Sequence, residues 1–333
     1  MANYDKLKES NDISRVITDD DDARKFLDSI RIREWLEQDD QKEFLKDEGN
    51  IENKITYLAN NILEAEKQNV KAFPQNTLDS KKHRSSLYKT DAKRKQLREQ
   101  IIKECMENKV IDDERVRLGM GGMLPKNSDL KNDKKLFFII GSPASGKSSI
   151  ANKFADAYGA FMLDSDLIKR KIPEFSIPLY GASLVHKESN IILHKIFNTH
   201  LSLGTNIVYQ LVGAEYDEFQ YDEEKQDFVN KGFHELVKSI EKEYGYQIFI
   251  VLPELDREIA TRRALRRFVE TKRYVPLTKI LDRYSNNAIR TFYKMHCFEP
   301  NYGYIVVDTN VPFNQSYKKV YCNKVAEEVF NAI

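Results

Sequence analysis

The apolar positions in the second part of the chain form short continuous runs separated by amphipathic stretches. The runs 136–140 and 247–252 are almost entirely apolar, which is typical of strands buried on both faces of a parallel sheet. Further strands are expected at 160–163, 205–210 and 304–307, and helices at 150–158, 189–203, 228–244 and 256–271. Strands that alternate with helices predict an α/β fold, a mainly parallel sheet flanked by helices.

The first 130 residues have a different pattern, in which apolar residues recur at helical spacing. Ile51, Ile55, Leu58 and Ile62 share one helical face, and 26–36 and 97–106 are further helix candidates. The acidic run 19–22 either caps the first helix or forms a solvated turn. The small residues of 118–125 and the polar stretch up to 135 predict a flexible linker. We therefore predict a mainly helical N-terminal region, residues 1–130, and a second domain, residues 131–333.

The composition limits the class of protein. Lys and Arg number 53 against 52 acidic residues, a net charge of +1, so no global field attracts nucleic acid or a membrane. The three cysteines are far apart and form no CxxC pair, which favours reduced thiols over disulfides or zinc. No apolar run is long enough to span a membrane and no signal peptide is visible. A cytoplasmic protein is expected, with export by a route that reads no cleavable signal left open.

The expected strand at 136–140 leads into a phosphate-binding loop that matches G-x-x-x-x-G-K-[ST] and precedes a helix. The glycines allow a tight turn whose N–H groups point at an anion. A lysine brings charge to the β- and γ-phosphates, and a serine hydroxyl can bind magnesium. ATP and Mg²⁺ are the predicted cofactors. The nucleotide-binding residues are Gly141, Ser142, Pro143, Ala144, Ser145, Gly146, Lys147, Ser148 and Ser149, with Ser148 the metal ligand.

Two further clusters follow the loop along the chain. Asp164 and Asp166 come directly after the second expected strand, where strand ends face the ligand crevice of such sheets. Asp166 is the better candidate for a general base, and the alternative is a helix N-cap. Five arginines lie in or just after the expected helix 256–271, and their spacing places them in two rows. They predict a lid that neutralises phosphate, and the alternative is a solvated basic face. The five are Arg262, Arg263, Arg266, Arg267 and Arg273.

With these clusters in this order, residues 130–310 resemble the zeta toxin family of P-loop kinases. The resemblance rests on the phosphate loop, on D-x-D at 164–166, on H-x-E-S at 186–189 and on R-x-x-x-T-x-R-x-V-P at 267–276. Members phosphorylate a UDP-N-acetylamino sugar with ATP. The resemblance implies a P-loop kinase fold and catalytic roles for Lys147, Asp166, Arg267 and Arg273. It also implies a substrate contact by Glu188, and Arg263 competes with Arg267 for neutralising the phosphoryl group. Asp164 and Arg263 are the further candidate substrate-binding residues.

The chain departs from the family pattern at the end of the third expected strand. Gln210 stands where the family has an acid, and Val212 where it has a hydroxyl. Lys272 replaces a glycine, and 214–230 looks like an acidic insertion. The phosphate chemistry is therefore expected to be intact, while the acceptor can differ: a nucleotide, a nucleic-acid end or an antibiotic are alternatives to the sugar nucleotide.

The helical region 1–130 has no counterpart in a minimal kinase. Family members are inhibited by a helical antitoxin, so residues 1–130 either inhibit the kinase in cis or serve as a docking or delivery domain. A different class of function, a P-loop switch protein acting through a partner, is the further alternative. Nucleic acid is not an expected partner because the basic residues lack interleaved aromatic side chains.

Overall fold

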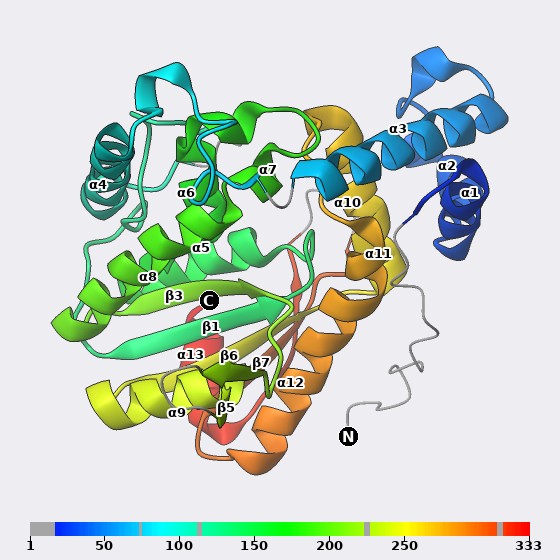
Figure 1. Ribbon diagram of the computed structural model, residues 1–333. Coiled ribbons are helices and arrows are strands. Elements are labelled where there is room, and N and C mark those ends of the chain that lie inside the picture. The colour runs from blue at the N-terminus through cyan, green and yellow to red at the C-terminus, as the bar shows by residue number, and fades with distance from the viewer. Residues whose placement is uncertain (1–16, 73–74, 112–114, 223–226, 312–315) are drawn as a thin grey trace.

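The computed structural model describes residues 17–72, 75–111, 115–222, 227–311 and 316–333. Within them the centre is a sheet with the strand order β2-β3-β1-β6-β7-β8 (Figure 1). The first five strands in this order run parallel, and β8 pairs antiparallel with β7. The strands are β1 (Lys135–Gly141), β2 (Phe161–Leu163), β3 (Ile207–Val212), β6 (Gln247–Glu254), β7 (Gly303–Asp308) and β8 (Lys318–Cys322). The predicted α/β fold and the five predicted strands are confirmed.

Helices cover both faces of this sheet because the side chains of its strands alternate between them. Phe137 and Ile139 of β1 pack with α5 and α13, whereas Leu136, Phe138 and Ile140 pack with α8, α9 and α12. The helices are α5 (Lys147–Tyr158), α6 (Ser165–Lys171), α7 (Gly181–Leu184), α8 (His186–Leu203), α9 (Phe233–Tyr244), α10 (Arg257–Thr271), α11 (Leu277–Lys279), α12 (Ser285–Phe298) and α13 (Glu327–Ala332). A π-helical turn, Ile280–Tyr284, joins α11 to α12.

The N-terminal region is helical, as predicted. It contains α1 (Asp20–Ser29), α2 (Ile32–Leu36), α3 (Ile51–Ala72) and α4 (Asp91–Glu107). The acidic run does cap α1, since the Asp19 carboxylate accepts the Asp22 N–H at 2.9 Å. In the part of the chain described, no helix combines the length and apolar character that crossing a membrane requires.

These helices share their cores with the rest of the chain. Apolar side chains of α1, α2 and α3 form one buried cluster with those of α10 and α11, and Figure 1 shows α3 lying beside α10. Those of α4, such as Leu97 and Ile101, belong to the core on the α8 face of the sheet. The boundary near residue 130 stays a prediction, and three buried hydrophobic clusters extend across it.

The predicted flexible linker at 118–125 is wrong. Met123 is fully buried, its N–H donates to Cys105 O at 2.8 Å, and its carbonyl accepts the N–H of Met162 in β2. Gly122 packs so closely that an added Cβ would lie 2.4 Å from the carbonyl oxygens of Glu104 and Asn108. Small residues here serve close packing, which composition alone does not distinguish from flexibility.

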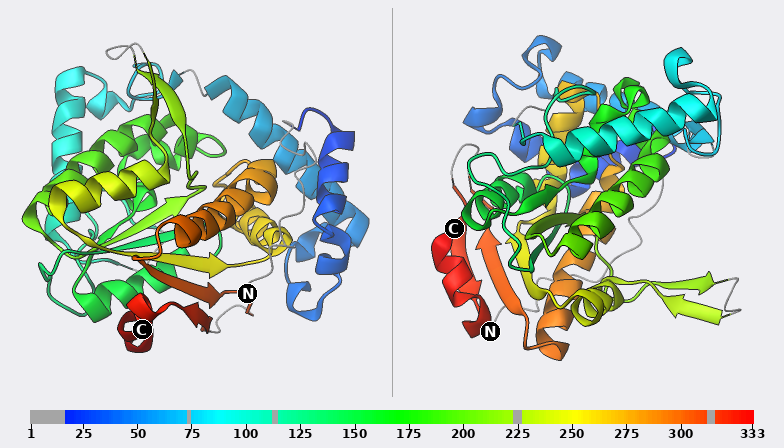
Figure 2. Two further views of the ribbon diagram at one scale, coloured as in Figure 1. Left: turned by 90° about the horizontal axis from the view of Figure 1, so that it is seen from below. Right: turned by 90° about the vertical axis from the view of Figure 1, so that its left-hand side faces the viewer.

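The predicted helix at 228–244 is wrong in its first part. Residues 227–230 form β5 (Asp227–Asn230), which pairs antiparallel with β4 (Phe219–Asp222), and α9 begins at Phe233. This hairpin projects from the body of the molecule (Figure 2). It carries much of the predicted acidic insertion 214–230, of which residues 223–226 lie outside the described residues. Gly232 lies between β5 and α9, and this glycine was the feature of the sequence that indicated where the helix begins.

Candidate nucleotide and phosphoryl-transfer site

The phosphate-binding loop connects β1 to α5 with the backbone that its sequence predicts. Gly146 has φ of +80° and Ala144 of +60°, so the loop turns through the left-handed region before α5 begins. A Cβ on Gly141 would lie 2.8 Å from the Ser145 hydroxyl. Ser142 and Ser145 are buried, and Pro143, Ala144, Ser148 and Ser149 complete the turn into α5. The loop is therefore a concave backbone turn at a helix N-terminus, where an anion is favoured.

Lys147 is buried and its ammonium group stays within the loop. Nζ donates to Gly141 O at 3.2 Å and to Ser142 O at 2.5 Å. Burial lowers the pKa of Lys147 to about 8, against the attraction of Asp166 and Asp164. A cation held in such a place is available to a phosphate, whose negative charge raises the pKa of the lysine and favours its charged form.

The two aspartates at the end of β2 have different roles. Asp164 is the N-cap of α6, since its Oδ1 accepts the Asp166 N–H at 2.8 Å. Asp166 therefore does not cap the helix, and its carboxylate lies 2.5 Å from the Arg273 guanidinium and 3.3 Å from Lys169 Nζ. Burial raises the pKa of Asp166, but Arg273 and Lys169 outweigh it and hold the pKa well below the usual range. The sequence analysis missed Lys169, although its i, i+3 spacing from Asp166 was a signal.

The arginine rows of α10 face two different neighbours. Arg262 donates to Ile30 O at 2.7 Å and Arg266 to Gln41 Oε1 at 3.1 Å, so this row faces the N-terminal helices. Arg263 binds the carbonyls of the segment after β7, with 2.7 Å to Val311 O. Arg267 is close enough to lower the pKa values of Lys147 and Asp166. Only part of the predicted basic lid therefore faces the phosphate-binding loop.

Glu188 lies elsewhere, in a buried ionic cluster with the N-terminal region. Its side chain is fully buried, and the Arg94 guanidinium of α4 lies between it and Glu174. The Arg94–Glu188 and Arg94–Glu174 ion pairs are 2.7 and 2.9 Å long, and Arg98 adds a third contact at 3.0 Å. A substrate role for Glu188 stays a prediction, because in this conformation its carboxylate contacts arginines and Thr77. No sequence pattern indicated this cluster.

Gln210 forms a hydrogen bond with the phosphate-binding loop, a contact that the sequence analysis did not predict. It lies near the end of β3, and its Oε1 accepts the Ser148 hydroxyl at 3.1 Å. Val212, the second departure from the family pattern, is 48% exposed two residues further on.

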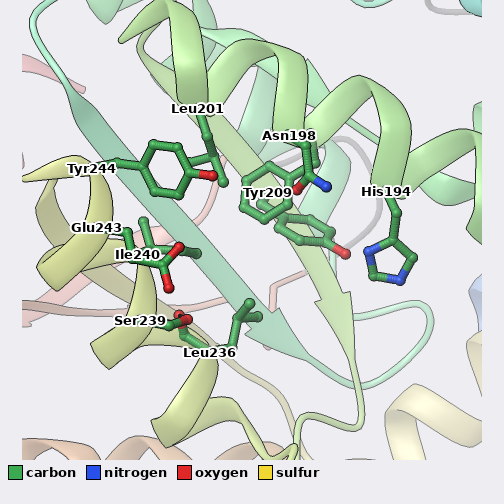
Figure 3. Close-up of a pocket in the computed structure, with 10 residues that line it drawn as sticks. His194, Asn198, Leu201, Tyr209, Leu236, Ser239, Ile240, Glu243 and Tyr244 are labelled. Atoms are coloured by element: carbon green, nitrogen blue, oxygen red, sulfur yellow. Dashed lines mark hydrogen bonds between the residues drawn. The ribbon is translucent and has the colours of Figure 1, made fainter.

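A separate pocket of about 270 Å³ opens between α8 and α9 (Figure 3). His194, Tyr209, Leu236 and Glu243 are among its lining residues, and none of the predicted site residues lines it. The candidate chemistry therefore belongs to the strand ends and not to this pocket.

The residues of the loop fit the nucleotide and the metal that its sequence implies. The buried Ser145 hydroxyl has no hydrogen-bond partner among the described residues, and the glycines leave room for phosphate oxygens close to the backbone. Lys147 and Ser148 offer the charge and the hydroxyl oxygen that a magnesium-bound triphosphate requires.

A strand, a phosphate-binding loop and a helix beside an aspartate and two arginines are the elements of a protein of the P-loop kinase type. The Zeta toxin family model matches residues 125–299, and the chain belongs to the zeta toxin family. The family resemblance inferred from the motifs is thus confirmed.

Two solved structures are similar to this chain. One comes from a study of the PezAT chromosomal toxin–antitoxin system of Streptococcus pneumoniae, with 13% identity, a TM-score of 0.44 and coverage of 73% of this chain and 87% of that chain. The other is a candidate kinase from Chloroflexus aurantiacus, with 14% identity, a TM-score of 0.38 and coverage of 55% and 92%. No curated protein sequence matches significantly.

Proposed function

We propose that this protein transfers the γ-phosphate of ATP to a hydroxyl group of a small molecule, in the first place a UDP-N-acetylamino sugar. The observation that carries the proposal is the convergence of Lys147, Asp166 and Arg273 at the carboxyl ends of β1 and β2. This arrangement combines phosphate binding with a carboxylate that can accept a proton, as phosphoryl transfer to an alcohol requires.

The roles of the residues follow from their positions. Lys147 binds the β- and γ-phosphates, and Ser148 would hold magnesium, which when bound neutralises charge on the phosphate oxygens. Asp166 orients the acceptor hydroxyl and accepts its proton. Arg273 pairs with Asp166 in this structure and is placed to move its charge to the transferring phosphoryl group, together with Arg267. That movement would also free the Asp166 carboxylate for the acceptor.

The test is mass spectrometry of UDP-N-acetylglucosamine incubated with ATP, magnesium and the full-length protein. A gain of one phosphate is expected, lost in Asp166→Asn and retained in the matched control Asp129→Asn, an exposed aspartate. ATP affinity should change far less than turnover in Asp166→Asn, because the substitution removes a base and not a phosphate contact.

A second acceptor class is favoured by one observation. Gln210 and Val212 at the end of β3 replace the acid and the hydroxyl of the family pattern, so acceptor recognition can differ here. Unmodified UDP-N-acetylglucosamine, with ATP still bound, would reject the sugar nucleotide and direct the same assay to nucleotides and to nucleic-acid ends. ATP binding without transfer to any acceptor would favour a P-loop switch protein.

We further propose that the N-terminal region inhibits the kinase in cis. Two contacts support this. Tyr274, next to Arg273, donates a hydrogen bond to the buried Glu66 of α3. Arg94 of α4 forms an ion pair with Glu188, the predicted substrate contact. The region restrains the segment that carries Arg273. Deleting residues 1–125 would also remove Leu97 from the sheet core, so a full-length variant is the better test.

Ile62→Asp places a charge in the cluster that α3 shares with α10, and Asn60→Asp on the exposed face of α3 is its control. Inhibition in cis predicts higher turnover in Ile62→Asp only. Equal or lower turnover with an unchanged melting temperature would reject inhibition in cis, whereas lower turnover with a lower melting temperature would show that α3 supports the fold instead.

A further inference from the structure

Gln210 occupies a special place in the sheet. It lies two residues before the end of β3 (Ile207–Val212), the neighbour of the P-loop strand β1, and pairs in register with Ile139. Tyr209 points to the face covered by α8, so the alternation of the strand directs Gln210, like Val208, toward α5. The side chain is 8% exposed. A neutral amide is thus buried beside the first turn of the phosphate-binding helix.

The hydrogen bond to Ser148 decides how the amide is oriented. A serine hydroxyl has one hydrogen and two lone pairs. Because the Ser148 hydroxyl donates its hydrogen to Gln210 Oε1, its lone pairs remain available to a cation. Gln210 therefore holds Ser148 in the orientation that metal binding requires.

The other end of the same amide is buried without a partner. Gln210 Nε2 has no hydrogen-bond partner among the described residues, and buried N–H groups are normally paired. An N–H group is repelled by a cation and attracted by an anion. Beside Ser148 and Lys147, the anion that fits is a phosphate oxygen of the nucleotide.

We propose that Gln210 is a nucleotide-positioning residue, with Oε1 orienting Ser148 toward magnesium and Nε2 donating to an oxygen of the terminal phosphate of ATP. The inference rests on the nucleotide site proposed above. A carboxylate at this place would attract the metal but repel the phosphate. The amide does neither, so ATP binding by the unchanged protein depends less on magnesium than ATP binding by a variant with a carboxylate at this position.

The test is calorimetric titration of ATP into full-length protein, once with magnesium and once with excess EDTA. Gln210→Glu is expected to bind ATP about tenfold more weakly than the unchanged protein in EDTA, because its charge faces phosphate oxygens. Magnesium should restore most of this loss. Gln210→Leu should lose affinity under both conditions, and Gln247→Glu, an exposed control in β6, should change neither.

Equal affinities of Gln210→Glu and unchanged protein under both conditions would overturn the inference. An equal loss of ATP affinity by Gln210→Glu with and without magnesium would overturn it as well, because a merely structural role predicts that result. ATP binding by the unchanged protein without transfer to any acceptor would reject the kinase proposal alone. No ATP binding at all would reject both. Melting temperatures of each variant check that the fold is retained.

Discussion

Replacing Arg94 with methionine tests how strongly α4 is joined to the kinase part. The guanidinium is fully buried, and its hydrogen bonds to Glu174 and Glu188 measure 2.7–2.9 Å. Methionine fills similar volume but leaves two buried carboxylates without their main counter-charge. Removing one partner of a buried ion pair costs about 3–5 kcal/mol, and Glu188 retains Arg98 and Thr77. We expect a loss in that range at pH 7, a large part of the stability of a typical domain.

The pH dependence distinguishes lost charge from lost packing. Burial raises the pKa of Glu188, but Arg94, Thr77 and Arg98 outweigh it and lower the pKa. The charged Glu188 therefore contributes to stability above about pH 4.3, the pKa of a glutamate in the unfolded chain. This contribution is lost as the pH falls through the lower pKa of Glu188 in the folded protein. Without Arg94 the folded pKa moves above the unfolded one, and stability instead falls as the pH rises. The Arg94→Met penalty should thus be largest at neutral pH and shrink toward pH 4.5.

The assay is urea unfolding between pH 4.5 and 8. Lys95→Met, an exposed residue on the same helix, should change stability by less than about 0.5 kcal/mol. Adding Glu174→Gln and Glu188→Gln to Arg94→Met removes the buried charges and should recover part of the loss. A penalty below about 1 kcal/mol, or one independent of pH, would refute the reasoning that these carboxylates are charged and buried.

Two further predictions concern the site, and a third concerns the backbone at Lys272. Lys147 has a pKa of about 8, and bound ATP favours its charged form, so ATP affinity should fall above pH 8 and binding should take up protons. Calorimetry in two buffers of different ionisation heat measures this proton uptake, and equal binding heats in both buffers would contradict the prediction. Arg273→Ala should move the acid limb of the pH profile of turnover to higher pH, because Arg273 lowers the pKa of Asp166. It should also lower turnover about 10²-fold or more. An unmoved acid limb would show that Lys169 alone holds the pKa of Asp166 low. Lys272 has φ of +57°, so Lys272→Gly should stabilise the protein by about 0.5–1 kcal/mol in urea unfolding, whereas Lys95→Gly within α4 should destabilise it by about 1 kcal/mol.

Local features were predictable to different degrees. The phosphate-binding loop followed from spacing, because its anion site is built from consecutive backbone groups. The choice between Asp164 and Asp166 did not, since either can cap a helix. Only the packed chain shows that Asp164 caps α6 and that Asp166 meets Arg273, 107 positions away in the sequence.

Longer-range contacts explain the remaining errors. The arginine spacing of α10 predicted two rows, but Ile30 at the end of α1 and Gln41 after α2 decided that the row of Arg262 and Arg266 faces the N-terminal region. The glycines of 118–125 suggested a linker, because composition does not distinguish a flexible glycine from one in close packing.

By itself, the sequence determined the alternation of strands and helices, the phosphate-binding loop and the family, because these depend on residues close together in the chain. The tertiary structure alone decided that Arg94 is buried between two glutamates, that α3 lies against α10, and that Gln210 holds Ser148. The physical reason is that burial and charge pairing depend on distances in space. Those distances exist only after segments far apart in the sequence have packed together.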